Sequence, residues 1–199
     1  RNIVLYHKRE IAKFIYTQLK EHFFIEQSGF EKPVVHPFTR IEPHNFSMYS
    51  KDSIRPYSET ILPTNTIPSK VFGGFKRACH NLYKFDSKAE KDFVSILETD
   101  KDVRKWLRPA SSQFKIYWSH NSKRYDPDFI VETKNIIYMI EVKAEKDMEN
   151  PEVQEKADAA KKYCESATEY NLTNNGKRWE YVLIPHTKIS LNKSFTGLI

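Results

Sequence analysis

Residues 125–143 read Tyr-Asp-Pro-Asp-Phe-Ile-Val-Glu-Thr-Lys-Asn-Ile-Ile-Tyr-Met-Ile-Glu-Val-Lys, and they decide the fold that we expect. Segments 125–131 and 136–142 are rich in aromatic and β-branched residues, and a polar turn at 133–135 separates them. The pattern predicts two strands joined as a tight hairpin. Because the second segment is apolar on both faces, we expect it at the centre of a sheet that is covered on both sides.

Three charged side chains stand at the open end of this hairpin. Glu141 and Lys143 are two residues apart and share one face of their strand, and a tight hairpin would bring Asp128 beside them. Two carboxylates and the Val142 carbonyl would then offer the hard oxygen ligands that Mg²⁺ prefers. Such a site generates hydroxide for phosphodiester cleavage, and the ammonium can orient the water. A surface ion pair between Lys143 and one carboxylate explains the same residues without chemistry.

The elements around the hairpin define the fold class. Hydrophobic periodicity and capping signals predict helices over 87–98 and 151–168, strands over 113–118 and 179–184, and a short helical turn over 103–107. The order helix, strand, strand, strand, helix, strand predicts an α/β domain with a mixed sheet of at least four strands flanked by helices.

The N-terminal third differs from the rest of the chain in composition. A periodic helix is predicted over 4–26, and six of the ten prolines fall between residues 33 and 68, where long helices cannot form. We therefore expect a helical and proline-rich connector or N-terminal extension over 1–68 and a separate domain over 69–199.

Glu90 belongs to the first helix of that domain. It stands three residues after Ser87, which is the capping-box spacing, and on the same helix face as Phe93, Val94 and Leu97. Glu90 either satisfies the start of the helix and nothing more, or points at the sheet and joins the metal or its water shell. Beside the two carboxylates and the lysine described above, we favour the second interpretation.

The composition excludes several classes of protein. Aromatic residues make up 14% of the 199 residues, which disfavours intrinsic disorder, and no apolar run reaches the roughly 18 residues of a membrane span. Cys79 and Cys164 cannot build a disulfide framework or a four-ligand zinc site, so we expect two buried, reduced thiols. No secretory signal is visible, which favours a cytoplasmic protein, and a chain that starts with Arg1 instead of Met is expected to be a fragment.

The net charge of +6 suits a protein that binds a polyanion. Basic residues near the predicted hairpin and on the last helix are candidate phosphate contacts, and a solvated surface explains them equally well. These candidates are Lys115, Lys123, Arg124, Lys156, Lys161 and Lys162.

Pro127-Asp128 followed by Glu141-Val142-Lys143 resembles the PD-(D/E)xK nuclease superfamily. Over about residues 70–190 the chain further resembles the C-terminal endonuclease domain of the restriction (helicase) subunit of type III restriction enzymes. The segments that carry this resemblance are Phe85-Asp86-Ser87-Lys88-Ala89-Glu90, Val103-Arg104-Lys105-Trp106, Tyr125-Asp126-Pro127-Asp128-Phe129, Glu141-Val142-Lys143 and Trp179-Glu180-Tyr181.

The resemblance implies a restriction-endonuclease-like core and metal-dependent cleavage of DNA. Asp128, Glu141 and Lys143 would be the catalytic trio and Glu90 the helix carboxylate, with Mg²⁺, or Mn²⁺ in its place, as the cofactor. The partners would be double-stranded DNA, an upstream helicase domain of the same chain and a methyltransferase (modification) subunit, with no membrane. The sequence holds no P-loop, so ATP would act only through the absent helicase region.

Other interpretations stay open. A second Glu-x-Lys, Glu132-Thr133-Lys134, lies in the predicted turn and cannot face Asp128 across a hairpin, so we interpret it as solvated. The domain could also be a non-catalytic DNA-binding or helicase-docking module with a nuclease-like fold. A third possibility is a repair or RNA-directed nuclease of the same superfamily.

Overall fold

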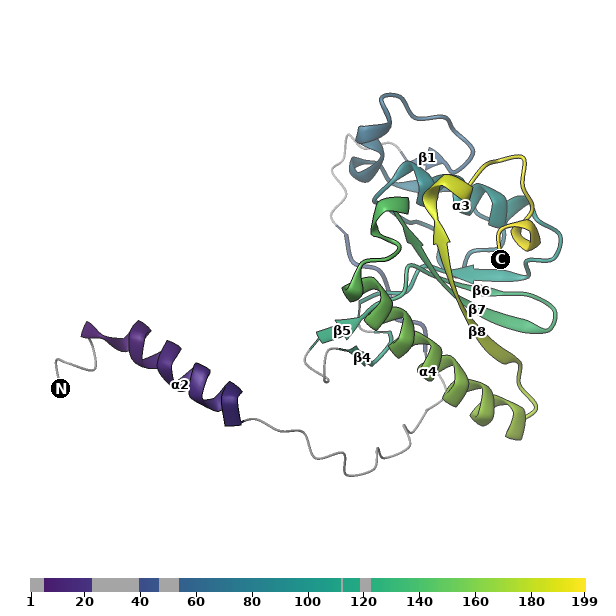
Figure 1. Cartoon of the computed structure of the whole chain (residues 1–199). Coiled ribbons are helices and arrows are strands. Elements are labelled where there is room, and N and C mark those ends of the chain that lie inside the picture. The colour runs from purple at the N-terminus through teal and green to yellow at the C-terminus, as the bar shows by residue number, and fades with distance from the viewer. Residues whose placement is uncertain (1–5, 23–39, 47–53, 112, 119–122) are drawn as a thin grey trace. The chain divides into compact units, whose positions relative to one another are not determined.

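The computed structural model of the chain (Figure 1) describes residues 6–22, 40–46, 54–111, 113–118 and 123–199. The chain divides into two compact units, residues 1–32 and 33–199. Within the second unit, Ile61 and Ile67 of the proline-rich segment are buried in the same core as the central sheet. The assignment of residues 1–68 as a connector or extension stays a prediction.

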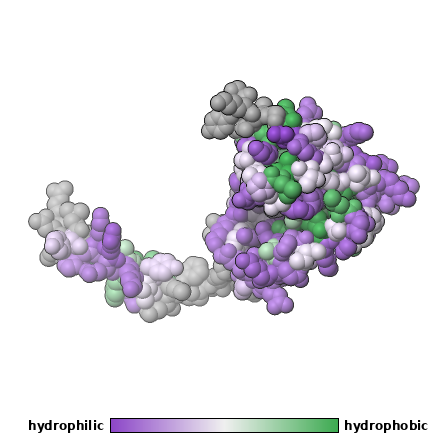
Figure 2. Space-filling model, turned by 90° about the horizontal axis from the view of Figure 1, so that it is seen from above, coloured by the Kyte–Doolittle hydropathy of each residue, from purple (hydrophilic) through white to green (hydrophobic). Residues whose placement is uncertain are grey.

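Helix α2 (Lys8–His22) lies in the first unit and forms the described part of the helix predicted over 4–26. Residues 4, 5 and 23–26 of that prediction lie outside the described residues. Phe14, Ile15 and Leu19 of α2 are exposed, and Figure 2 shows hydrophilic and hydrophobic side chains along its surface.

The second unit is built on a four-stranded sheet in the order β3-β6-β7-β8. Strand β7 (Ile136–Lys143) pairs antiparallel with β6 (Phe129–Glu132) and parallel with β8 (Arg178–Pro185), and β3 (Lys105–Leu107) pairs antiparallel with β6. The mixed sheet predicted from the sequence is therefore confirmed. The doubly apolar strand is indeed an interior one, since β7 has neighbours on both sides.

A helix covers each face of this sheet (Figure 1). Helix α3 (Lys88–Thr99) contributes Phe93 to a core cluster with Phe129 and Ile140, and α4 (Pro151–Thr173) contributes Cys164 to a second cluster with Ile130 and Met139. Neighbouring residues of a strand point to opposite faces, so β6 and β7 serve both clusters at once. Both helices confirm the prediction, although α4 runs five residues further than the predicted end at 168.

Both helices start where capping chemistry predicts. Ser87 accepts a hydrogen bond from the Glu90 backbone at 3.1 Å, and Asn150 accepts one from the Glu152 backbone at 2.9 Å. Side-chain caps satisfy backbone N–H groups that have no partner inside the helix.

Two local predictions were wrong. Residues 105–107 form the edge strand β3 instead of a helical turn, because Trp106 and Leu107 bury their side chains while the strand pairs with β6. The strands predicted over 113–118 and 125–131 do not both enter the main sheet. Instead, β4 (Ile116–Trp118) and β5 (Lys123–Tyr125) form a separate antiparallel ribbon, and Pro127 lies in the break between β5 and β6.

The remaining regular elements are short. They are β1 (Arg55–Pro56), which pairs parallel with β2 (Phe72–Gly73), and the 3₁₀ turns Thr64–Ser69, Glu145–Asp147, His186–Lys188 and Phe195–Gly197.

The two cysteines have different environments. Cys164 is buried, and burial raises the pKa of its thiol to about 12. The prediction that Cys79 is buried was wrong, because this residue, which follows β2, is exposed. Within the described part of the chain, no helix has the length and apolar character needed to cross a membrane.

Candidate active site

The β6–β7 hairpin brings two carboxylates together. Phe129 pairs with Ile140 in the antiparallel register, so the next step along the ladder sets Asp128 opposite Glu141. Oδ2 of Asp128 accepts a hydrogen bond of 2.8 Å from the Val142 backbone, which fixes the carboxylate at the strand end. The approach of Asp128 to Glu141 predicted from the sequence is confirmed.

The acidic pair and the lysine point to one face of the sheet. Ile130 and Met139 face α4, and side chains two residues further along each strand share that face. Asp128, Glu141 and Lys143 therefore lie on the α4 side, at the end of the sheet where β6 begins and β7 ends.

Glu141 has a partner on each carboxylate oxygen. Oε1 lies 2.5 Å from the Lys143 ammonium, and Oε2 accepts a hydrogen bond of 2.9 Å from the Tyr125 hydroxyl. The Glu141 side chain is only 6% exposed, whereas that of Lys143 is 30% exposed and reaches solvent.

The electrostatics of the pair follow from burial and proximity. Burial and the charge of Glu141 raise the pKa of Asp128 to about 7. Burial lowers the pKa of Lys143, but the Glu141 and Asp128 carboxylates outweigh that effect and raise it overall. The Tyr125 pKa is raised well above its usual value by burial and by Glu141, so the hydroxyl remains a hydrogen-bond donor. A largely buried pair of like charges is a place where a cation is favourable.

Glu90 reaches the site from α3, on the other side of the sheet. Its buried carboxylate accepts a hydrogen bond of 3.0 Å from the Asp86 backbone, one residue before the helix cap, and it pairs with Arg108. Its charge also contributes to raising the pKa of Asp128 and of Lys143, which places it near the trio. Glu90 therefore combines the capping contact with an electrostatic influence on Asp128 and Lys143.

Arg108 is a site residue that the sequence analysis missed. It follows β3, is 14% exposed, and pairs with both Asp86 and Glu90. Its guanidinium lies 5.9 Å from the ring centroids of Phe85 and of Phe129. Nothing in the local sequence pairs an arginine with a carboxylate 18 residues earlier, so only the fold reveals this contact. Tyr125 was also missed, although its place three residues before Asp128 was a usable signal.

The donor set fits a magnesium ion. In the described residues, no group of three or more His, Cys, Asp or Glu side chains is arranged to hold a metal. Mg²⁺ keeps several waters and needs only one or two carboxylates, which Asp128 and Glu141 provide on one face. The oxygen-only chemistry of this pair suits Mg²⁺ or Mn²⁺ and does not suit zinc.

The candidate phosphate contacts fall into two groups. Lys115 is exposed just before β4, and Lys123 and Arg124 are exposed on β5, so these three belong to the ribbon. Lys161 and Lys162 are exposed on α4. Lys156, near the start of α4, is half-buried and lies against the ribbon residue Trp118.

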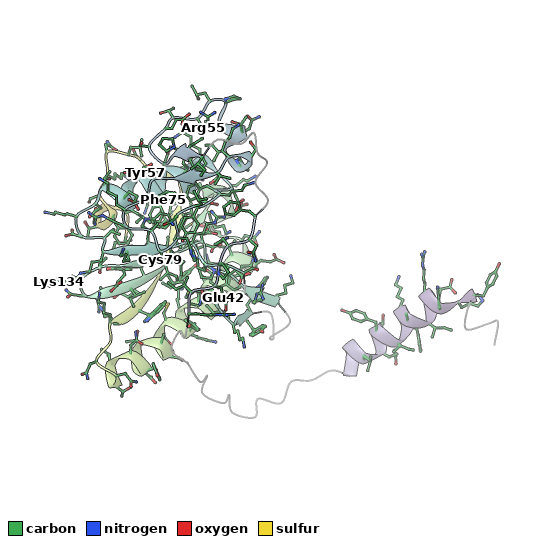
Figure 3. All side chains as sticks on the ribbon, turned by 180° about the vertical axis from the view of Figure 1, so that it is seen from behind. Glu42, Arg55, Tyr57, Phe75, Cys79 and Lys134 are labelled. Atoms are coloured by element: carbon green, nitrogen blue, oxygen red, sulfur yellow. The ribbon has the colours of Figure 1, made fainter. Side chains whose placement is uncertain are left out.

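The second Glu-x-Lys takes no part in this site. Lys134 is exposed in the β6–β7 turn, and Figure 3 shows it projecting outward from the end of the hairpin. Glu132 pairs with Lys177 at 2.5 Å. Lys134 is solvated as expected, but Glu132 is the last residue of β6 and is held in an ion pair, so only part of this motif lies in the turn.

Residues 100–171 match the family described as TnsA-like endonuclease N terminal. The matched region runs from before β3 to near the end of α4, and it contains Asp128, Glu141 and Lys143 but not Glu90. A comparison with curated proteins found no match. The family match indicates a nuclease of the PD-(D/E)xK type, the same class that the motifs indicate.

Proposed function

We propose that this chain contains a Mg²⁺-dependent DNA endonuclease domain that hydrolyses phosphodiester bonds. The observation that carries the proposal is the pairing of Asp128 and Glu141 across the hairpin, with the Lys143 ammonium 2.5 Å from Glu141. The match of residues 100–171 to a TnsA-like endonuclease supports the same class of reaction. We assign the nuclease domain to residues 69–199.

Each site residue has a role that its surroundings support. Asp128, Glu141 and the Val142 carbonyl would hold the ion, and Glu90 would join them or bind a water of its shell. When bound, the ion would lower the pKa of a water molecule and stabilise charge on the phosphate. Lys143 reaches solvent, so its ammonium can orient the attacking water and neutralise charge that develops on a phosphate oxygen.

The reaction needs no covalent enzyme intermediate. The oxygen of water bonds to phosphorus and releases its proton to solvent as the bond to the leaving sugar oxygen breaks, and the sugar oxygen takes up a proton from solvent. Lys143, with its pKa raised by Glu141 and Asp128, stays protonated and acts as a fixed charge, not as a base.

The two resemblances differ in the partners that they imply for this nuclease. The type III resemblance would add an upstream helicase domain, ATP use and a methyltransferase subunit, in the cytoplasm. The TnsA-like match supports the nuclease activity, but it does not support those partners. A helicase motor with its P-loop, directly upstream in the full gene product, would support the type III assignment, and its absence there would argue against it.

The test is cleavage of supercoiled plasmid DNA by the 199-residue chain with Mg²⁺, with Mn²⁺ and with EDTA. We expect cleavage with either metal and none with EDTA. Asp128→Ala and Lys143→Ala should each lower the rate by at least about 100-fold, the scale on which fixed transition-state charges act.

Lys177→Ala is a matched control. Lys177 pairs with Glu132 at 2.5 Å and is 24% exposed, so its removal breaks a similar ion pair at the other end of the hairpin. Normal cleavage by Lys143→Ala in Mg²⁺ would refute the assigned role. Binding of DNA without cleavage under any metal condition would favour the non-catalytic module, and a preference for RNA would favour the RNA-directed nuclease.

A further inference from the structure

Two ammonium groups from different elements converge on one tryptophan. The Nζ atoms of Lys123 and Lys156 lie 4.7 and 4.8 Å from the ring centroid of Trp118. Lys123 stands directly opposite Trp118 in the β4–β5 ladder, and Lys156 comes from the second turn of α4. Two positive charges at one aromatic ring repel each other, and the ring attracts both.

This cluster lies at the catalytic end of the sheet. Strand β5 leads directly to Asp128, and α4 begins eight residues after Lys143. The ribbon residues Trp118 and Tyr125 belong to the core cluster on the α4 side, the face that carries the catalytic carboxylates. Tyr125 of the same ribbon contacts Glu141 at 2.9 Å.

The anions already present compete weakly for these lysines. Glu152 lies 3.3 Å from the Lys123 ammonium, but both side chains are more than half exposed, at 62% and 54%. Water screens an exposed pair of this kind, so the pair is weak and a phosphate can replace it. A free lysine side chain loses rotamer entropy when a ligand fixes it, and packing on Trp118 already restricts both side chains before any ligand arrives.

We propose that Lys123 and Lys156, held on Trp118, form a phosphate clamp that binds the DNA backbone beside the scissile phosphate. This inference rests on the proposed nuclease function and adds where the substrate is held. Successive phosphates of one strand rise about 3.4 Å along the duplex, so a clamp on the same face as Asp128 and Glu141 engages phosphates near the cut. The two lysines contribute affinity and register, not base recognition.

The simplest alternative is packing. Lysine stems commonly cover apolar rings while their ammonium groups stay in water, with no ligand involved. The two interpretations differ in whether the ammonium groups of the two lysines contribute to DNA binding. A salt titration measures how many phosphate contacts the protein makes, and so distinguishes them.

The experiment uses Asp128→Asn as a cleavage-inactive background and follows a fluorescein-labelled duplex by anisotropy in EDTA over a range of KCl. Each phosphate contact contributes about 0.9 to the slope of log K against log salt. We expect Lys123→Ala/Lys156→Ala to reduce that slope by nearly two and to weaken binding at least tenfold at low salt. Circular dichroism should show an unchanged fold, because neither lysine side chain is a core residue.

A charge-matched control separates the clamp from general electrostatics. Lys101 is exposed just beyond α3, and Lys134 is exposed in the β6–β7 turn (Figure 3). Strand β7, which is roughly 23 Å long from Ile136 to Lys143, separates the turn that holds Lys134 from Lys143. Lys101→Ala/Lys134→Ala removes the same two charges and should leave the slope unchanged.

Trp118→Leu tests the role of the ring. It keeps both charges but releases them, so we expect weaker binding with a nearly unchanged slope. Equal slopes for the clamp double variant and the control double variant would overturn the clamp. If the wild-type chain still cleaves plasmid with Mg²⁺ in that case, the proposed nuclease function stands without the clamp. Absence of both cleavage by the wild type and duplex binding by the inactive background would overturn the proposed function as well.

Discussion

The Tyr125 hydroxyl donates a hydrogen bond of 2.9 Å to Oε2 of Glu141, inside the domain. Lys143 contacts the other oxygen of the same carboxylate, so Glu141 is held from two sides. The ribbon strand β5 thereby positions a carboxylate of the main sheet, which gives the ribbon a structural role in the site.

Tyr125→Phe should weaken the response to metal. The substitution removes one hydrogen bond to a charged group, a contact that contributes about 1.5–3 kcal/mol, and leaves the ring in place. We expect the Mg²⁺ concentration for half-maximal plasmid cleavage to rise roughly tenfold, because Glu141 loses its fixed orientation. Tyr117→Phe is the control, since Tyr117 is exposed on the same ribbon. An unchanged Mg²⁺ dependence in Tyr125→Phe would show that Lys143 alone orients the carboxylate.

Arg108 and Glu90 should be strongly coupled in stability. Removing Arg108 leaves the buried Glu90 carboxylate without its cation, a change that costs about 3–5 kcal/mol in comparable pairs. We therefore expect Arg108→Ala to be much less destabilising in a Glu90→Gln background. A double-mutant cycle in urea should give a coupling free energy of about 1–3 kcal/mol.

The pair Arg55 and Glu59, at 3.2 Å, is more exposed than the Arg108–Glu90 pair and provides the comparison for that cycle. Its coupling should stay below about 1 kcal/mol. Equal coupling in the two cycles would mean that Arg108 does not specifically hold Glu90.

Glu98 should matter for stability and not for cleavage. Its buried carboxylate accepts hydrogen bonds from the Trp106 indole and the Lys76 backbone at 2.7 Å each, and from the Arg77 backbone at 3.1 Å. Glu98→Ala leaves the buried Trp106 indole and two partly buried backbone donors without this acceptor, at about 1–3 kcal/mol for a buried group. We expect a loss of at least about 3 kcal/mol in urea unfolding followed by tryptophan fluorescence, and a smaller loss for Glu98→Gln. Glu155→Ala, at an exposed position of α4, should be neutral.

His44 should make the domain less stable in mild acid. Burial and the positive charge of Arg108 lower the pKa of His44, and the backbone carbonyl of Arg108 accepts a hydrogen bond of 2.9 Å from its ring. Tyr83 and His80 face the same ring at 5.6 and 6.5 Å. The folded protein therefore binds this proton less readily than the unfolded chain, where histidine titrates near 6.5.

The sign of the pH effect follows from that difference. The stability that neutral His44 contributes is complete above about pH 6.5 and is lost as the pH falls through the lower folded pKa. Urea unfolding between about pH 5 and 8 should show the wild type losing more free energy on acidification than His44→Gln. The titration of Asp128 has the opposite sign but is common to both proteins, so it cancels in the comparison. Parallel pH profiles would contradict the prediction.

The sequence by itself determined the acidic pair. A three-residue polar turn between two apolar strands leaves one register that buries both faces, and that register sets Asp128 opposite Glu141. The starts of α3 and α4 were equally readable, because Ser87 and Asn150 act on backbone groups only two or three residues away. The caps act within three residues and the acidic pair is set by a single hairpin, so each of these contacts depends on a short stretch of chain.

Only the tertiary structure decided what surrounds that pair. Strand β3 is too short to be distinguished from a helical turn by its pattern, and it is a strand because β6 offers it an edge. Arg108 meets Glu90, and Lys156 meets Trp118, because the sheet stacks α3 on one face and α4 with the ribbon on the other. These partners are far apart in sequence, and packing of the two apolar clusters, not any local preference, brings them together.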